Sequence, residues 1–308
     1  MTDVAGYEAE MRACANAIGL DPPAIVIPED RWVTLRGIRF HYLDWGNDEK
    51  PPLVLLHGGS LTAHTWDMAA LLLQPYYHLI ALDQRGHGDT DWTPDDQLDQ
   101  DNDALMLSDT EAFIDFLGLE RVILCGMSMG GNNAYRYAAR HPDRLRALVI
   151  VDVAPKLMPA GQERMRSFRR ETETLAQFED FLERAVKFSP HRAPEHLRYS
   201  LLHALKQTAD GWTWKQDHRR VAPDEAEVKR KVEELWAAAR AITTQTLLVR
   251  GADSQVLSED SQQRTAAAMV DCDTVTIQRA THNVHSDNPK DFVAAMDRWL
   301  VARLGPQR

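Results

Sequence analysis

The chain has little that would indicate a disulfide framework or a polyanionic partner. Only 3 of its 308 residues are cysteine, and Cys14, Cys125 and Cys272 lack metal-ligand spacing, so we expect reduced thiols. Lysine and arginine total 35 against 46 acidic residues, and this net charge of -11 argues against nucleic acid or an anionic membrane as a partner. We therefore expect the partner to be a small molecule that is uncharged or apolar.

Long apolar runs are absent as well. No stretch approaches the roughly 20 residues that cross a bilayer, and the chain does not begin with basic residues followed by an apolar core. These absences predict a protein of the cytoplasm with no membrane partner.

What the chain does have is enough apolar residues for one large core. Hydrophobic residues make up 44% of the sequence, which suits a single domain with a sizeable insertion. Apolar stretches alternate with amphipathic ones from residue 53 to 152 and again after residue 243. Because continuous apolar strands are buried on both faces, this alternation predicts a parallel sheet covered by helices. The expected strands are 53–57, 77–83, 122–127, 147–152, 246–250 and 274–278, and the expected helices are 65–73, 102–117, 132–140, 259–269 and 289–304.

Two segments precede this alternation. Residues 3–18 place apolar side chains on one helical face before a glycine and a proline pair end the pattern. This helix can dock on its own domain, which is the simplest expectation, or pack over an insertion or against a second copy of the chain. The last alternative is the one indication of a homodimer. Residues 31–45 then predict a β-hairpin that turns at Arg36-Gly37.

The alternation stops after Pro155. From residue 156 to about 241 the apolar residues follow only helical spacing, which predicts a helical cap inserted into the core. Within the cap, Trp212 and Trp214 lie among turn-forming residues, and they either belong to a loop lowered toward a site or bind the cap to the core. The expected parts are an N-terminal helical extension (1–23), a first part of the core (24–155), the helical cap (156–242) and a second part of the core (243–308).

One stretch of the core carries the strongest chemical signal. Val122 to Met127 predicts a short buried strand, Ser128 stands in a Gly-x-Ser-x-Gly pattern, and a helix is expected from Asn132 onward. A serine between a strand and a helix is held on a sharp turn with its hydroxyl exposed. Its neighbours must be small, because a Cβ there would collide with the strand or the helix. This context predicts a nucleophile elbow.

With this elbow the chain resembles the α/β-hydrolase family over nearly its whole length. Three further motifs match the family in the same order: His57-Gly58-Gly59-Ser60, the segment 83–89 and the segment 281–285. The resemblance implies an α/β fold with a mostly parallel eight-stranded sheet, helices on both faces and a helical cap insertion. It also implies a serine hydrolase that uses no cofactor.

A serine hydroxyl needs a base within hydrogen-bond reach and a third group that orients this base. His282 is the expected base, because it follows an apolar strand on a loop at the sheet edge that also carries Ser128. In the resemblance His282 matches the catalytic histidine, although Thr281 precedes it where glycine is more usual.

Three other histidines belong to the same motifs. We expect His57 and His87 to make structural hydrogen bonds to the backbone. His285 could pair with His282, but no third ligand is evident, so we predict no metal.

Two aspartates compete for the role of the acid that orients His282. In many relatives the acid follows the strand that here is 246–250, in the pattern Gly-x-x-Asp, but this chain has Ser254 at that position and Asp253 one residue earlier. In other relatives the acid closes the preceding core strand, where this chain has Asp152. A carboxylate there is costly to desolvate without a charged or donor partner, and a histidine would supply one. Asp152 is the preferred acid and Asp253 the alternative.

The oxygen of a tetrahedral intermediate needs two backbone donors. The Met129 N–H lies at the start of the elbow helix, and the Gly59 N–H lies in a loop of small residues that lets the backbone approach a substrate. We expect these two groups to form the oxyanion hole. The glycines of this loop could equally serve only to permit a tight turn.

The expected reaction is hydrolysis of a carboxylic ester or lactone through an acyl-enzyme on Ser128. Relatives with the same three residues cleave thioesters, amides or carbon–carbon bonds, and the sequence does not separate these. Epoxide hydrolases and haloalkane dehalogenases of this fold carry aspartate at the elbow, which argues against both. A homologue that binds a small molecule without turning it over is the alternative from another class.

Overall fold

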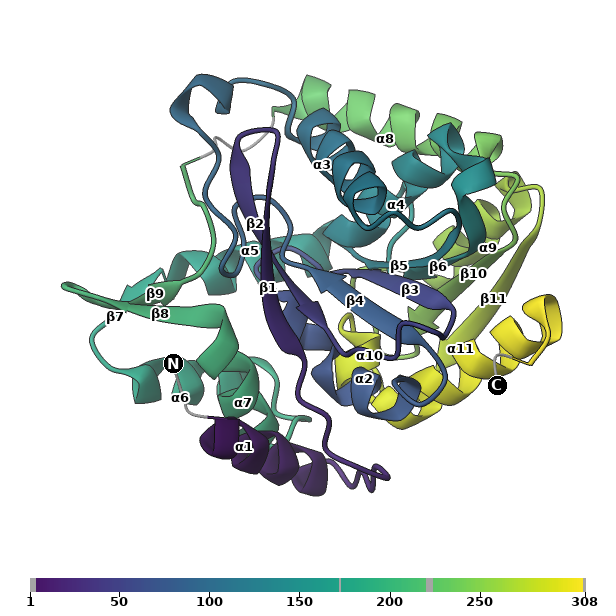
Figure 1. Cartoon of the computed structure of the whole chain (residues 1–308). Helices are drawn as coiled ribbons and strands as arrows, with labels where there is room; N and C mark the ends of the chain where they lie inside the picture. Colours follow the sequence, from purple (N-terminus) through teal and green to yellow (C-terminus); the bar gives the residue numbers. More distant parts are fainter. Residues whose placement is uncertain (1–3, 172, 220–223, 307–308) are drawn as a thin grey trace.

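A central eight-stranded sheet organises the computed structural model, which describes residues 4–171, 173–219 and 224–306 (Figure 1). The strand order is β1-β2-β4-β3-β5-β6-β10-β11. The strands are β1 (Glu29–Leu35), β2 (Ile38–Asp44), β3 (Pro52–Leu56), β4 (His78–Leu82), β5 (Val122–Met127), β6 (Leu145–Val151), β10 (Thr246–Gly251) and β11 (Cys272–Ile277).

Six of these strands are parallel, and β1 and β2 form an antiparallel hairpin at one edge. The hairpin turns at Arg36 and Gly37, whose φ angles of 52° and 81° are both left-handed, as a tight two-residue turn requires. All six residues of β5 are buried, because helices cover both faces of the sheet. The predicted fold class and the hairpin are confirmed.

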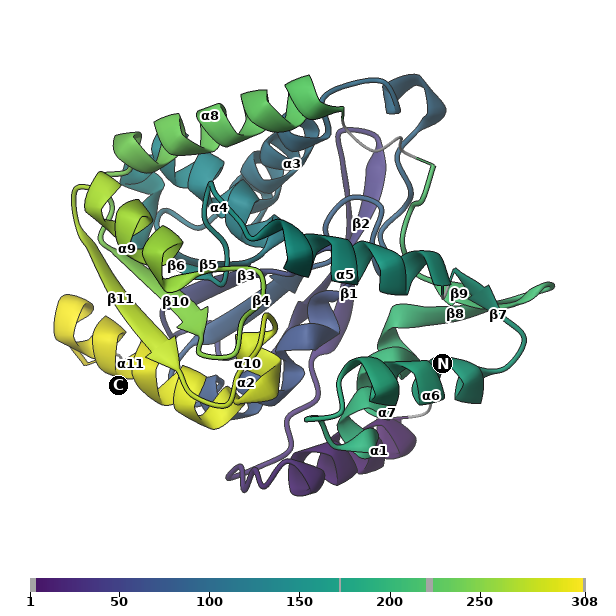
Figure 2. The same cartoon turned by 180° about the vertical axis from the view of Figure 1, so that it is seen from behind.

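Alternate residues of each strand face two separate cores. Leu53 and Leu55 of β3 pack with the helices on one side, whereas Val54 and Leu56 pack with the helices on the other. Figures 1 and 2 show these two helical layers. One layer contains α2 (Asp67–Leu73), α10 (Val284–Asp287) and α11 (Pro289–Leu304). The other contains α3 (Asn102–Phe116), α4 (Met129–Arg140), α8 (Glu225–Ala241) and α9 (Glu259–Ala268).

The segment between β6 and α8 leaves this layered pattern. It contains α5 (Pro159–Glu171), β7 (Thr174–Leu175), α6 (Phe178–Phe188), α7 (Pro194–Ala204), β8 (Leu205–Thr208) and β9 (Gly211–Trp214). The three short strands form a second sheet, β7-β9-β8. The predicted helical cap therefore contains a small sheet that the prediction did not include, in which Leu175 pairs with Trp212 instead of lying on a helix. Strands of two and four residues are too short to leave a period of their own in the sequence.

Helix α8 also departs from the prediction. The sequence predicts it as part of the cap, but it packs against α4 and α9 of the core, with Leu235 and Ala239 buried. An amphipathic stripe identifies which face of a helix is buried and does not identify its partner. In the rest of this article, "the cap" means residues 156–217.

The N-terminal helix α1 (Val4–Ala17) contacts both parts of the molecule. It packs against α7 of the cap, and its buried Met11 and Cys14 join Met68 and Leu71 of the core helix α2. The helix thus docks within its own chain, and a homodimer stays a prediction. All three cysteines are free thiols. None of the helices in the described part of the chain combines the length and the apolar character needed to cross a bilayer.

Candidate active site

The site is built around the turn between β5 and α4. Ser128 has φ 51° and ψ -112°, a conformation that L-residues rarely adopt, and its N–H donates to Val151 O at 3.1 Å. The strained turn lifts the side chain out of the sheet at the carboxyl end of the strand. The predicted strand–turn–helix arrangement is confirmed.

The glycines beside the serine are required by close backbone packing. A Cβ on Gly126 would lie 2.3 Å from Gly130 O, and a Cβ on Gly130 would lie 2.3 Å from Leu56 O. At Gly131 a Cβ would lie 2.4 Å from Val153 Cγ1. Backbone atoms cannot yield by that much, so the first two positions exclude every other residue without a shift of β3 or α4.

The structure brings Ser128, His282 and Asp152 into one hydrogen-bonded chain. Ser128 Oγ lies 3.0 Å from His282 Nε2, and His282 Nδ1 lies 2.8 Å from Asp152 Oδ2. Because an ionised carboxylate can only accept, Nδ1 carries the proton and Nε2 is left to accept from the serine hydroxyl. This is the geometry in which a histidine can act as a general base toward a serine.

Asp152 is completely buried, and donors surround it. Its Oδ1 accepts from the Gly251 N–H at 3.0 Å, and its Oδ2 accepts from Ser254 Oγ at 2.6 Å in addition to His282. Ser254 occupies the position where the family pattern would place an acid, and it binds the acid instead. Asp253 is exposed, and its only bond among the described residues is its N–H to Ala280 O. The structure does not bring Asp253 to His282.

The loop that carries His282 is held in place by hydrogen bonds to the buried carboxylate of Asp287. Both the N–H and the hydroxyl of Thr281 donate to Asp287 Oδ2, at 2.8 and 2.5 Å. Arg192, from the cap, binds the other oxygen of Asp287 at 2.5 Å. Burial opposes ionisation of Asp287, but Arg192 and the hydrogen bonds hold its pKa well below the usual value. Thr281, the departure from the usual glycine, therefore has a structural role.

The two residues expected to supply the oxyanion donors lie at the same cavity as the serine. Gly59 and Met129 line it together with Ser128, and neither N–H donates to another described group. The loop is fixed by His57, whose Nδ1–H donates to Gly58 O at 2.8 Å and whose Nε2 accepts from the Gln84 N–H at 2.9 Å. Burial lowers the pKa of His57, so the ring is neutral and can accept at Nε2.

The remaining motif histidines are structural as well. His87 Nδ1–H donates to Arg85 O at 2.9 Å, and His285 Nε2 lies 2.9 Å from Thr65 Oγ1. Burial lowers the pKa of each to about 3. The expected structural roles of His57 and His87 are confirmed. Across the described ranges, His282 belongs to no group of residues that could hold a metal ion.

Comparison with known proteins decides the family. The model of the alpha/beta hydrolase family matches residues 53–295. The chain belongs to this family. It is 30% identical over 275 residues to the esterase Rv0045c of Mycobacterium tuberculosis, an alignment that covers 85% of this chain and 86% of the esterase. The crystal structure of that esterase matches with a TM-score of 0.76 at 25% identity, over 97% of this chain and 99% of the esterase.

A second solved structure supports the fold alone. The crystal structure of E-2-(acetamidomethylene)succinate hydrolase has a TM-score of 0.76 at 20% identity, covering 89% of this chain and 99% of that protein. From the family and the esterase relative, the chain is a hydrolase that acts on ester bonds.

The catalytic cavity of this hydrolase has a volume of about 330 Å³ and is lined by both core and cap. Its wall is largely apolar, and Trp214 contributes to it from β9. Trp212, two residues earlier, packs inside the cap against Phe178, with 5.3 Å between ring centroids. Trp214 also packs inside the cap, with 5.5 Å between its ring centroid and that of Phe181, so both tryptophans stabilise the cap and only Trp214 lines the cavity as well. The other apolar lining residues are Leu61, Met106, Met127, Met129, Val153, Leu157, Met165, Phe168, Phe188 and Val256.

Two lining residues had no recognisable signal in the sequence. Arg136 reaches the cavity from α4 and binds Asp103 at 2.9 Å. Arg169 reaches it from α5, on a helix whose several arginines look like an ordinary solvated face. Only the three-dimensional arrangement shows which of these arginines points inward.

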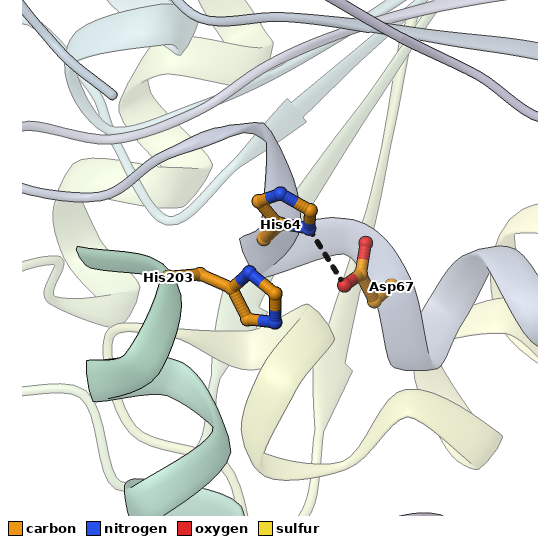
Figure 3. Close-up of side chains that lie close together, drawn as sticks. All are labelled: His64, Asp67 and His203. Atoms are coloured by element: carbon orange, nitrogen blue, oxygen red, sulfur yellow. Dashed lines mark hydrogen bonds and ion pairs between the residues drawn. The ribbon is translucent and has the colours of Figure 1, made fainter. Parts of the chain in front are cut away.

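A polar cluster joins this hydrolase's core to its cap at another place. His64 and Asp67 come from the core and His203 comes from α7 (Figure 3). His64 Nδ1 lies 3.0 Å from Asp67 Oδ2, which also accepts from the hydroxyls of Tyr7 at 3.2 Å and Tyr199 at 2.5 Å.

Histidine and aspartate are ligands for transition metals. However, the rings of His64 and His203 stack with centroids 3.8 Å apart and an interplanar angle of 26°. A nitrogen lone pair lies in the plane of its ring, so two nearly parallel rings cannot both direct one at the same ion. In this orientation the side chains connect the cap to the core and do not form a metal centre.

Proposed function

We propose that this hydrolase cleaves a carboxylic ester or a lactone of a small substrate through an acyl-enzyme on Ser128. The observation that carries the proposal is the continuous chain from buried Asp152 through His282 to Ser128, which ends in a cavity of about 330 Å³. The apolar wall of this cavity suits an acyl or alcohol group of low polarity.

In the first half of the reaction, Ser128 Oγ attacks the carbonyl carbon and its proton passes to His282 Nε2. The carbonyl π pair moves onto oxygen, where the N–H groups of Gly59 and Met129 stabilise the negative charge. When the carbonyl re-forms, the C–O bond to the alcohol breaks and His282 donates its proton to the departing oxygen. An ester linkage to Ser128 remains.

In the second half, water replaces the alcohol. His282 Nε2 takes a proton from the water, the hydroxide attacks the acyl carbon, and the bond to Ser128 Oγ breaks with return of the proton to the serine. Asp152 keeps its charge throughout, holds the Nδ1–H tautomer and stabilises the imidazolium. The bonds from Gly251 and Ser254 fix the direction of its carboxylate.

Thioester, amide and carbon–carbon bond hydrolysis use the same residues and remain alternatives for the scissile bond. A binder without turnover is disfavoured, because the serine and the histidine lie at 3.0 Å and the esterase relative matches over most of both chains.

The test uses wild type and Ser128→Ala with a series of p-nitrophenyl esters of increasing acyl length and with a simple six-membered lactone. We expect wild-type turnover, loss of at least about 10,000-fold in Ser128→Ala, and an acyl adduct on Ser128 detectable by intact mass after rapid acid quench. Circular dichroism confirms that the variant is folded. Equal rates in the two proteins would remove the support for a serine esterase and move the search to thioester, amide and diketone substrates.

A further inference from the structure

Helix α5, which forms part of the cavity wall, is positively charged in a negatively charged protein. It contains four arginines and two glutamates, whereas the whole chain has a net charge of -11. Figure 2 shows α5 extending from the core toward the small sheet of the cap. Arg166, Arg169 and Arg170 of this helix line a second cavity of about 520 Å³, next to the catalytic one.

Among the arginines of α5, Arg169 is partly buried and has no described acidic partner, whereas Arg164, which also lacks one, is exposed and donates to Gln255 Oε1 and Phe188 O. Arg170 lies 2.7 Å from Glu163, and Arg166 lies 3.9 Å from the same residue. The Arg169 guanidinium makes a single hydrogen bond within the described chain, from Nη1 to Ser60 Oγ at 3.1 Å, and no described carboxylate oxygen lies within 4.0 Å of it. Burial and the nearby charge of Arg166 lower the pKa of Arg169. A partly buried cation without a counter-charge is unfavourable unless a ligand supplies one.

The position of Arg169 connects it to the catalytic machinery. It lines the catalytic cavity with Ser128 and His282, and it shares the boundary of the two cavities with Met129 and Trp214. Its partner Ser60 directly follows Gly59, and Ser60 Oγ donates to Gln216 Oε1 at 2.6 Å. This chain of contacts from α5 through Ser60 to Gln216 holds the guanidinium where the two cavities meet.

We propose that Arg169 is the anion-binding residue of the substrate pocket and that the ester cleaved by this hydrolase carries a carboxylate group. A guanidinium has five N–H donors, of which Ser60 uses one, and its planar fork matches a carboxylate. The apolar wall takes the rest of the substrate, so the favoured molecule is apolar in the middle and anionic at one end. This inference rests on the proposed ester hydrolysis and refines its substrate class.

The experiment compares esters that differ only in a carboxylate. Monoethyl adipate and ethyl hexanoate place the difference on the acyl side, and 4-acetoxybenzoate and phenyl acetate place it on the alcohol side. The proteins are wild type, Arg169→Gln, Arg169→Lys and Arg164→Gln. Arg164 is a matched control because it lies on the same helix, is exposed and lines neither cavity. Circular dichroism and thermal unfolding check that each variant is folded.

We expect wild type to prefer the charged member of at least one pair. Arg169→Gln should lower kcat/KM for that ester by roughly 10- to 100-fold and change its neutral partner by less than about 3-fold. Arg169→Lys should give an intermediate loss because it keeps the charge without the fork, and Arg164→Gln should match wild type. An equal effect of Arg169→Gln on both members of each pair, or a wild-type preference for the neutral ester in both pairs, would overturn the anion-binding role.

A binding measurement separates this inference from the proposed function. Calorimetry compares monoethyl adipate with diethyl adipate on Ser128→Ala and on Ser128→Ala/Arg169→Gln. Selective binding of the monoester that depends on Arg169, together with no turnover of any tested ester by wild type, would support the anion site and contradict the esterase. Turnover of neutral esters by wild type without Arg169-dependent monoester binding would support the esterase and contradict the anion site.

Discussion

The two walls of the catalytic cavity are constructed differently. On the core wall, Ser128, His282 and Asp152 are positioned by backbone hydrogen bonds, by glycines that allow no Cβ, and by a carboxylate with no exposed surface. On the cap wall, Trp214 stands on a four-residue strand and Arg169 is held by one hydroxyl. We therefore expect the core wall to set the reaction and the cap wall, which has fewer constraints, to set the choice of substrate. Substitutions in matched pairs can test this division.

The largest expected effect concerns the two aspartates. Asp152→Asn should lower kcat for a p-nitrophenyl ester by about 10,000-fold, because an amide at that position no longer holds the Nδ1–H tautomer of His282. Asp253→Asn should stay within about 2-fold of wild type, because its side chain is exposed and away from the histidine. Steady-state kinetics on both folded variants measures the contrast, and a loss at Asp253 alone would place the acid on the other strand.

At high pH the core should lose the stabilisation that protonated His41 provides. Burial opposes protonation of His41, but hydrogen bonds to Asp30 and Asp83 raise its pKa to about 9. Asp83 also accepts from the Ala63 N–H at 2.6 Å, just after the oxyanion loop.

Because the folded pKa of His41 exceeds the unfolded value near 6.5, its contribution is complete below pH 6.5 and disappears as pH rises through about 9. This contribution of His41 to the free energy of unfolding is on the order of 3 kcal/mol. Urea unfolding of wild type and His41→Asn should show a difference in the free energy of unfolding that shrinks over this interval. A difference independent of pH would contradict the charged state of His41.

One glycine in each wall allows a direct comparison of how far the two walls can shift. Gly130→Ala in the elbow should cost roughly 1–3 kcal/mol of stability and abolish turnover, because its Cβ meets the Leu56 carbonyl oxygen at 2.3 Å. Gly161→Ala in α5 meets Gln255 O at 2.0 Å, but α5 belongs to the cap and can shift away from the core. It should change KM more than kcat. Denaturant unfolding and kinetics on both variants check this, and equal loss of kcat would show that the cap wall is as rigid as the core wall.

The smallest expected effect concerns the tryptophans of β9. Trp214→Ala should raise KM for long acyl chains by about 10-fold and leave acetate esters nearly unchanged, because the ring lines the cavity. Trp212→Ala should lower the melting temperature without altering chain-length preference, because its ring packs on Phe178. If the two variants share one selectivity profile, the separation of these roles is wrong.

The sequence predicts the core wall far better than the cap wall for a physical reason. The elbow, the oxyanion loop and the histidine loop are contiguous segments in which backbone packing dictates glycine or a polar residue at fixed positions. The alternation of strands and helices, the hairpin and the closing helix follow from long periodic stretches. The sequence leaves the acid ambiguous because Asp152 and Asp253 both lie just beyond the ends of neighbouring parallel strands, β6 and β10. Only the structure shows that Asp152 is buried against His282 and that Asp253 is exposed.

The cap gives no such signals. Strands β7 and β9 are two and four residues long, so their period is hidden among helical spacings. Helix α8 has the stripe expected of a cap helix and packs on the core. Arg169 is one of four arginines on α5, and the sequence does not distinguish it from the others. That no described carboxylate lies beside it becomes apparent only from the positions of the surrounding acidic side chains.

The docking of α1 has a mechanical consequence. This helix contacts α7 in the cap and α2 in the core, and its Tyr7 hydroxyl donates to Asp67 of α2. It therefore connects the cap to the core (Figure 1). Any separation of the cap from the core would have to break the contacts of α1 with α7 or with α2. We therefore expect α1, which lines neither cavity, to resist such a separation, and a fluorescent label on this helix would report it.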